Sequence, residues 1–350
     1  QDDVGGIIGV NGDANTVENV VNATSVDGND YVGGLVGSNG GSVTNGRNNG
    51  EINGKNYVGG LVGSNSADST LTNLVNDSSA AITGEKYVGG IAGTNAGKIT
   101  AANQETLVNR GDITGQNYIG GVAGENVGTI EYVKNDVTLH VADKNNDAQY
   151  FGGVAGINGR VDDPSTPDNE AAIGTITNAT NRGDVIAQNA DFVGGIVGWN
   201  TANGVLTGMG NSNEGRVEGN TYVGGVAGLN DAAITGTAEE MVGITNSGVV
   251  IAHGGGAGGI FGVNAGKIEY AHISNTGIVS GTDSKDSATA GTGGLIGVNN
   301  GDIIHSSLTN ELSGQVMGMQ NVGGLIGINT GKVSGGRDAA DSYYTYQVYN

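Results

Sequence analysis

The side chains that most often carry chemistry are few and scattered along this chain. It has no cysteine and four histidines, His140, His253, His272 and His305. None of these histidines has a carboxylate, a serine or a second histidine at a spacing typical of a nucleophile triad or a zinc site. The missing cysteines exclude disulfides, Cys-ligated zinc and iron–sulfur clusters. The sequence therefore predicts no catalytic residue and no bound cofactor, and we expect a protein that is not an enzyme.

One acidic segment has the chemistry of a cation site. The residues from 160 to 172 depart from the surrounding repeats and contain both prolines of the chain. Carboxylate oxygens are the ligands that calcium prefers, and the candidates here are Asp162, Asp163, Asp168 and Glu170. The ligand spacing of an EF-hand or of a calcium-binding nonapeptide repeat is absent. The alternative is an insertion without a binding role.

Asparagine recurs with great regularity. Copies of the pattern Gly-Gly, two apolar residues, Gly, any residue, Asn end at Asn11, Asn39, Asn65, Asn95, Asn126, Asn158, Asn200, Asn230, Asn264, Asn299 and Asn329. An element repeated eleven times is typical of an array rather than of a single active site. Stacked in register, these side chains would form a hydrogen-bonded ladder, and asparagine also suits the corners of such a fold.

The copies recur about every thirty residues, and each contains three strand-like pieces. They are the Gly-Gly stretch, a Gly-x-Ile piece such as residues 97–99, and an Asn-x-Gly-x-Ile piece such as residues 109–113. β-Branched residues fill these pieces, Gly and Asn bound them, and no helical periodicity is present. We therefore predict an all-β fold, a single parallel β-solenoid (β-helix) of about eleven coils with roughly three short strands per coil. At about 4.8 Å per coil, this gives a rod on the order of 50 Å long.

The domain organisation follows from the repeats. Residues 1–336 are expected to form the solenoid, with a loop insertion near 160–172, and residues 337–350 a Tyr-rich strand or cap. This segment contains Tyr343, Tyr344, Tyr346 and Tyr349. It is interpreted as the last strand of the final coil, or as a possible assembly strand donated to the next copy in a fibre.

Two apolar positions follow each Gly-Gly pair, as in Leu35 and Val36. Neighbours in a strand point to opposite faces. One column would then line the core, and the other would lie outside under an inserted loop, a partner or another copy. Alternatively, a twist or bulge turns both side chains inward. Glycine at the paired positions is expected to allow a positive φ or a close approach of neighbouring backbones.

The charge of the chain limits its partners. The formal net charge is -21, from 14 basic and 35 acidic residues, which disfavours nucleic acid and anionic membranes. No apolar run is long enough to cross a membrane as a helix. The chain opens on Gln1, Asp2 and Asp3 without the features of a signal peptide. We expect either that a signal was cleaved or that the chain is a piece of a longer protein.

Residues 57–65 (Tyr-Val-Gly-Gly-Leu-Val-Gly-Ser-Asn) and 118–126, with Gly128-Thr129-Ile130 following, resemble the GLUG repeat, named for its Gly-Leu-apolar-Gly core. The resemblance extends over nearly the whole chain, although the copies at 256–259 and 290–294 lack the aromatic–Val lead. GLUG repeats occur in large exported bacterial surface proteins, including adhesins and the non-catalytic part of some immunoglobulin A peptidases. The resemblance implies a β-solenoid stalk or adhesive module outside the cell. It supplies no catalytic residues, and the zinc-peptidase motif His-Glu-x-x-His is absent.

Together these features lead us to expect an exported bacterial cell-surface protein, structural and adhesive, whose rigid rod mediates adhesion or assembles into an extracellular fibre. Its expected partners are other copies of itself, bound end to end or laterally, or a host receptor or glycan. One alternative is a carbohydrate-binding or carbohydrate-active β-helix that uses inserted loops. Another is the non-catalytic spacer of a large secreted peptidase.

Overall fold

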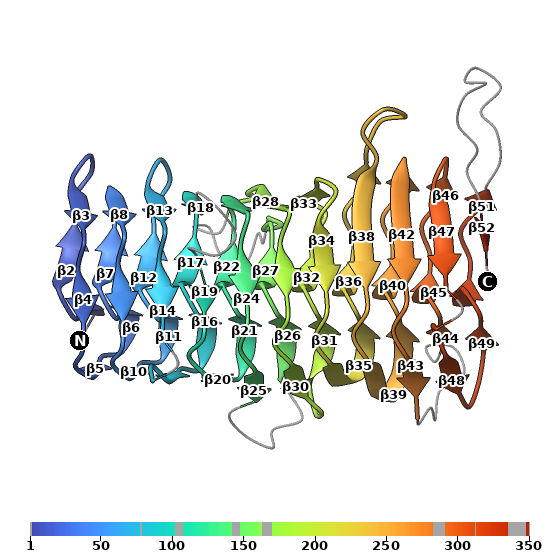
Figure 1. Cartoon of the computed structure of the whole chain (residues 1–350), viewed down its shortest axis with the longest axis horizontal. Helices are drawn as coiled ribbons and strands as arrows, with labels where there is room; N and C mark the ends of the chain where they lie inside the picture. The colour runs from blue at the N-terminus through green and yellow to red at the C-terminus, as the bar shows by residue number, and fades with distance from the viewer. Residues whose placement is uncertain are drawn as a thin grey trace.

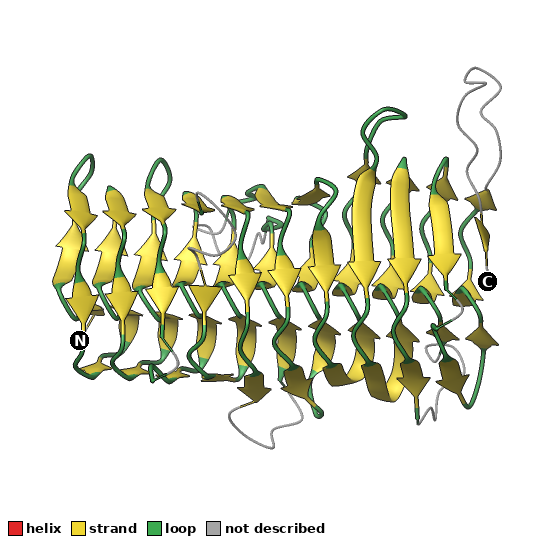
Figure 2. Cartoon of the chain, viewed as in Figure 1, coloured by secondary structure: helices red, strands yellow, loops and turns green. Residues whose placement is uncertain are grey.

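The chain folds as a parallel β-solenoid, which confirms the predicted fold class. The computed structural model describes residues 2–77, 79–101, 108–141, 148–162, 170–282, 291–311, 313–334 and 348–349. Within these ranges the regular structure is all strand, and the coils follow one another along a single axis (Figures 1 and 2). No described helix is long and apolar enough to cross a membrane.

Equivalent strands of successive coils lie side by side in five stacks, and the strand pairs within the described stacks are parallel. Stack one contains β1 (Asp2–Gly5), β6 (Asp30–Gly33), β11 (Asn56–Gly59), β16 (Lys86–Gly89), β21 (Asn117–Gly120), β26 (Gln149–Gly152), β31 (Asp191–Gly194), β35 (Val217–Gly224), β39 (Val250–Gly258), β44 (Thr292–Gly293) and β49 (Val322–Gly323). Stack two contains β2 (Ile8–Asn11), β7 (Val36–Asn39), β12 (Val62–Asn65), β17 (Ala92–Asn95), β22 (Ala123–Asn126), β27 (Ala155–Asn158), β32 (Val197–Asn200), β36 (Ala227–Asn230), β40 (Phe261–Asn264), β45 (Ile296–Asn299) and β50 (Ile326–Asn329).

The remaining stacks complete each coil. Stack three contains β3 (Thr16–Glu18), β8 (Ser42–Thr44), β13 (Thr70–Thr72), β18 (Lys98–Thr100), β23 (Thr129–Glu131), β28 (Gly174–Thr177) and β33 (Gly204–Thr207), and it resumes as a separate sheet of β37 (Ile234–Thr235), β41 (Ile268–Glu269), β46 (Ile303–Ile304) and β51 (Val333–Ser334). Stack four contains β4 (Val21–Asn22), β9 (Arg47–Asn48), β14 (Val75–Asn76), β19 (Val108–Asn109), β24 (Lys134–Asn135), β29 (Thr180–Asn181), β34 (Asn211–Asn213), β38 (Val242–Asn246), β42 (Ala271–Asn275), β47 (Ser307–Asn310) and β52 (Val348–Tyr349). Stack five contains β5 (Val26–Asp27), β10 (Ile52–Asn53), β15 (Ile82–Thr83), β20 (Ile113–Gly115), β25 (Leu139–Val141), β30 (Val185–Ala187), β43 (Val279–Gly281) and β48 (Val316–Gly318), and the long strands β35 and β39 belong to both stack one and stack five.

Each coil is therefore divided more finely than the three strands that the sequence predicted. The Gly-Gly stretch of the second coil is two strands, because β6 ends at Gly33 and β7 begins at Val36. The Asn-x-Gly-x-Ile piece is likewise split, here into β9 and β10. Only the Gly-x-Ile piece remains one strand.

The corner between β6 and β7 settles the orientation of the two apolar columns. The backbone amides of Leu35 and Val36 both donate to the carbonyl of Leu61 in the next coil, at 2.9 and 3.0 Å. The chain turns between them, and both side chains are fully buried in the same apolar cluster. The interpretation in which a bulge turns both inward is therefore correct. The expectation of an outer apolar column is wrong, and lateral contacts between copies stay a prediction.

The described interior contains two apolar clusters. The larger includes Leu35, Val36 and Val43, and the smaller includes Val32 and Ile52. Each recurs through successive coils, so each forms a continuous core along the rod.

Candidate functional site

The eleven asparagines singled out from the sequence lie in one line along the axis. Each closes a strand of stack two. From Asn11 to Asn299, Nδ2 donates to Oδ1 of the equivalent asparagine one coil further, at distances from 2.7 Å (Asn11 to Asn39) to 2.9 Å (Asn39 to Asn65). Nδ2 of Asn39 also donates to the Gly41 carbonyl in its own coil at 2.9 Å. From Asn39 to Asn299 these side chains are fully buried. We call this line the first asparagine ladder.

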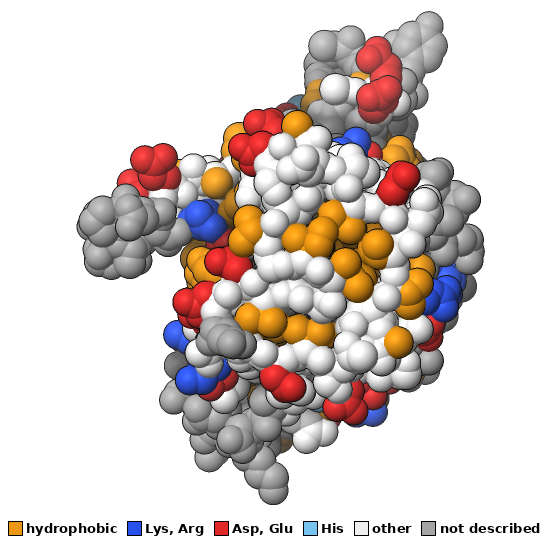
Figure 3. Space-filling model, turned by 90° about the vertical axis from the view of Figure 1, so that its left-hand side faces the viewer, with side chains coloured by type: hydrophobic (Ala, Val, Ile, Leu, Met, Phe, Trp, Pro, Cys, Tyr) orange, Lys and Arg blue, Asp and Glu red, His pale blue; other side chains and the backbone are white. Residues whose placement is uncertain are grey.

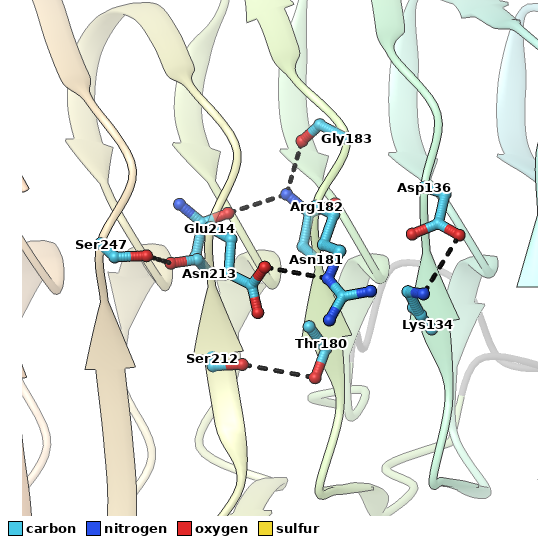
Figure 4. A network of polar contacts seen from close by, with 10 residues as sticks. All are labelled: Lys134, Asp136, Thr180, Asn181, Arg182, Gly183, Ser212, Asn213, Glu214 and Ser247. Carbon is cyan, nitrogen blue, oxygen red and sulfur yellow. Dashed lines mark hydrogen bonds and ion pairs between the residues drawn. The ribbon is translucent and has the colours of Figure 1, made fainter. Parts of the chain in front are cut away.

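A second asparagine ladder runs through stack four and was not predicted. It consists of Asn22, Asn48, Asn76, Asn109, Asn135, Asn181, Asn213, Asn246, Asn275 and Asn310, joined by Nδ2-to-Oδ1 bonds of 2.7–3.3 Å. Figure 4 shows two of its members, with Nδ2 of Asn181 donating both to the Gly183 carbonyl and to Oδ1 of Asn213. The sequence signal was the recurring Asn-x-Gly, in which the asparagine caps its own turn and also bonds the next coil.

Outside the core, stack one carries a ladder of aromatic rings. Tyr31, Tyr57, Tyr87, Tyr118, Tyr150, Phe192 and Tyr222 stack face to face with ring centroids 4.7–5.2 Å apart. Each of these residues has a φ between 54° and 65°, a left-handed conformation that is unfavourable for a bulky side chain. Because the rings cover each other's faces, their stacking offsets that strain. We infer that the aromatic ladder stabilises the fold and does not offer open ring faces to a ligand.

Four tyrosines of this ladder have a raised pKa. Burial raises the pKa of Tyr57, Tyr87, Tyr118 and Tyr150 above the ordinary value of 10.0, and neighbouring negative charges raise it further. The largest effect is on Tyr87, where the Glu125 carboxylate is the main charged contributor. These phenols therefore stay neutral at any physiological pH.

A buried ion pair lies beside the tyrosines. Glu125 is 4 % exposed and accepts two hydrogen bonds from Arg160, one of them from Nε at 2.9 Å. The hydroxyl of Thr94 donates to the same carboxylate at 3.0 Å. The Glu125 hydrogen bond raises the pKa of Arg160, so the guanidinium remains charged.

This ion pair also fixes the base of the predicted insertion. The backbones of Arg160 and Ala172 exchange hydrogen bonds of 2.8 and 3.0 Å. Nδ2 of Asn203 donates to the Arg160 carbonyl at 2.7 Å. The insertion therefore begins and ends at one anchored point on the side of the rod.

Only two of the four calcium candidates lie within the described residues. Asp162 and Glu170 are exposed, whereas Asp163 and Asp168 lie outside the described residues. In the described part of the chain, no group of three or more His, Cys, Asp or Glu side chains is placed to hold a metal ion. Calcium binding at this insertion stays a prediction.

Two of the four histidines take part in local polar contacts. Nε2 of His253 lies 2.8 Å from the buried Glu218, which also accepts from Gln188 at 2.7 Å. Nδ1 of His305 lies 3.3 Å from Glu269. These contacts join neighbouring coils.

An open cavity of about 520 Å³ lies where stack three is interrupted between β33 and β37. Its lining includes Met209, Met241, Glu239 and Glu240. No motif in the sequence indicated it, because it results from a mismatch between two sheets.

The predicted C-terminal strand is partly described. Val348 and Tyr349 form β52, which pairs in parallel with β47 of the same chain, with Tyr349 opposite Thr309. This places Tyr349 in the last coil. Tyr343, Tyr344 and Tyr346 lie outside the described residues, so donation of this segment to another copy stays untested.

Comparisons with known proteins identify no relative. A scan against protein-family models, a search of curated proteins and a search of solved structures each returned no match.

Proposed function

We propose that the protein is an exported, non-catalytic rod at a bacterial cell surface, with a structural and adhesive role. The observation that carries this proposal is the continuity of both asparagine ladders along the coils. Each coil is held to the next by these side-chain bonds and by the parallel strand pairs, all directed along the axis. Such a rod keeps its two ends at a fixed separation, which is what a stalk or a fibre requires.

The acidic composition supports the same role. A net charge of -21 keeps an extended protein soluble and suppresses unspecific contacts with anionic surfaces. The extracellular and bacterial parts of the proposal rest on the resemblance of the repeats to GLUG repeats. Nothing in that resemblance requires an enzymatic activity of this chain.

The proposal is tested by locating the protein and by measuring adhesion. Immunogold labelling of intact source cells should decorate the outer surface. Beads coated with the chain should adhere to host extracellular matrix or to neighbouring cells more strongly than beads coated with an acidic globular protein. Labelling confined to the cell interior would refute the extracellular role, and equal adhesion of both kinds of bead would refute the adhesive role.

A further inference from the structure

The end of the rod formed by the first coil exposes the interior. Figure 3 looks onto this end, where apolar side chains gather in two bands among polar ones. Ile7 is 43 % exposed, and two apolar side chains beside it, Val10 and Val21, are 62 % and 56 % exposed. In the second coil Ser38 and Arg47 hold the places of these two valines, on the side of the rod. Leu35, which occupies the place of Ile7 in the second coil, is fully buried. The apolar area that each inner coil covers with its neighbour is therefore open to solvent here.

The first asparagine ladder is directional, so its two ends differ. Nδ2 always donates toward the C-terminal end. In the part of the chain that is described, Oδ1 of Asn11 accepts no hydrogen bond, whereas Oδ1 of Asn39 accepts one from Asn11. At the other end, Nδ2 of Asn329 donates to the Gly331 carbonyl at 2.7 Å, and among the described residues it has no second acceptor, whereas Nδ2 of Asn299 also donates to the next coil. In the described structure, one end of the ladder therefore lacks a donor and the other lacks an acceptor.

In sequence, β2 of the first coil resembles the equivalent strands of the last two coils more closely than that of the second coil. The sequence of β2, Ile-Gly-Val-Asn, is identical to that of β45, and β50 differs from it only by Ile328 in place of the valine. The second coil has Ser38 at the place of Val10. The place of the aromatic ladder is held by Asp3 in the first coil and by Asn321 in the last, both with a positive φ. Over residues 3–11, the first coil therefore resembles residues 321–329 of the last coil.

The end formed by the last coils is exposed as well. Met317, Met319 and Val322 are 50 %, 71 % and 48 % exposed. The strands β49, β50 and β51 are the last described members of their stacks, so their outer edges are unpaired in the described structure. Unpaired parallel strands beside exposed apolar side chains are a template for further strands.

We propose that the N-terminal end of one copy stacks head to tail on the C-terminal end of a second copy. In this arrangement β2 of one copy pairs in parallel with β50 of the other. Val10 then lies on Ile328, Ile8 on Ile326, and Nδ2 of Asn329 donates to Oδ1 of Asn11. A contact between two different ends does not close on itself, so it propagates into a filament. The inference deepens the proposed structural role and rests on it for its biological meaning.

A second copy fits this end better than an unrelated partner for three reasons. The occupant must present parallel strands at the spacing of one coil, an amide donor in line with the ladder, and apolar residues over Ile8 and Val10. The last coil of the same chain supplies all three through Asn329, Ile326 and Ile328. The register also sets Asp3 against Asn321 and not against another carboxylate.

The test is the self-association of the 350-residue chain in analytical ultracentrifugation as its concentration is raised, with electron microscopy of the product. The wild-type chain should form end-to-end filaments one rod wide. Val10→Lys and Ile328→Lys should each weaken association about tenfold or more. Mixed together, these two variants should form pairs that grow no further, because each variant retains one intact end. Val205→Lys, an exposed position on the side of the rod, is the matched control and should associate like the wild type.

Three outcomes would overturn the inference: a wild-type chain that stays monomeric, a Val10→Lys variant that associates normally, or a mixture of the two variants that forms no pairs. If either lysine variant fails to fold by circular dichroism, Asn329→Asp takes its place. It keeps the size of the side chain and the acceptor for Asn299 but removes the amide donor to Asn11 of the next copy, so it should weaken association. The outcomes are separable from those of the proposed function. A chain that adheres but stays monomeric refutes only the stacking, and one that forms filaments but does not adhere refutes only the adhesion.

Discussion

Asn48 lies directly against Gly34, and this contact joins the Gly-Gly motif to the second asparagine ladder. A Cβ added to Gly34 would lie 2.5 Å from Cγ of Asn48 and 2.3 Å from the Gly60 carbonyl oxygen. The glycine is therefore required by the close approach of its neighbours, because its own φ is not in the left-handed region. Equivalent contacts recur in other coils, as between Gly60 and Asn76.

Replacing this glycine should be costly. We expect Gly34→Ala to lower the free energy of unfolding by about 3 kcal/mol, because neither the buried asparagine nor the backbone carbonyl can move away. Urea denaturation followed by circular dichroism measures the change. Gly12→Ala is the control, since the nearest atom to its added Cβ is the end of a flexible side chain at 3.2 Å. Equal stabilities of the two variants would contradict the packing described here.

The interior of the first asparagine ladder should be sensitive to truncation. Asn126→Ala removes the bond to Asn158 and the shortest bond of the buried Asn95 amide, whose other acceptors are backbone carbonyls at 3.2 and 3.3 Å. We expect a loss of about 2–4 kcal/mol in the free energy of unfolding. Asn53→Ala, which removes an exposed side-chain bond to Asp27, should cost less than about 1 kcal/mol. If both substitutions cost the same in urea denaturation, the ladder does not stabilise the fold.

Two arginine–glutamate pairs of the rod, one with a buried carboxylate and one exposed, should contribute differently to the free energy of unfolding. Arg160→Ala leaves the buried Glu125 carboxylate without its cation, and we expect a loss of about 2–4 kcal/mol. Arg182→Ala breaks the exposed pair with Glu214, whose atoms lie 2.9 Å apart, and should cost about 0–1 kcal/mol. Thermal unfolding of both variants makes the comparison, and a larger loss from Arg182→Ala would refute it.

The aromatic ladder predicts a loss of stability at high pH. Burial raises the pKa of Tyr87 above its ordinary value of 10.0, so the neutral phenol is favoured in the folded state. The resulting stability is fully present below pH 10 and is lost as the pH rises from there toward the higher pKa of the folded protein. Tyr87→Phe removes the titrating group, so its free energy of unfolding should fall less between pH 8 and pH 11 than that of the wild type. An identical fall in both proteins would contradict the assignment.

The overall fold could be predicted because the same sequence motif recurs about every thirty residues. Gly-Gly pairs and closing asparagines such as Asn39 and Asn65 fix the length and register of a coil, and a parallel solenoid follows. The number of strands per coil could not be predicted, because the corner between Gly33 and Val36 lies inside an apolar run that looks like one strand. Its inward-facing Leu35 and Val36 result from this turn, which alternation along a strand does not reveal.

The first asparagine ladder could be predicted from the sequence, but the second asparagine ladder and the aromatic ladder could not. Asn48 and Asn109 stand in a recurring Asn-x-Gly pattern, yet their stacking depends on which strands meet inside the coil. Aromatic residues such as Tyr31 and Tyr57 recur before most of the Gly-Gly pairs, but their left-handed conformation is one that propensity rules disfavour for tyrosine. The likeness between the two ends of the rod is present in the sequence, since Val10 resembles Val298 and Ile328 more closely than it resembles Ser38.

Buried ladders of asparagine side chains join each coil to the next. The most direct measurement is hydrogen exchange of the Asn side-chain amides, followed by ¹⁵N-resolved NMR after transfer into D₂O. We predict that the Nδ2 protons of ladder residues such as Asn126 and Asn181 persist long after those of exposed asparagines such as Asn15 have exchanged. Loss of all side-chain amide signals at the same rapid rate would contradict the claim.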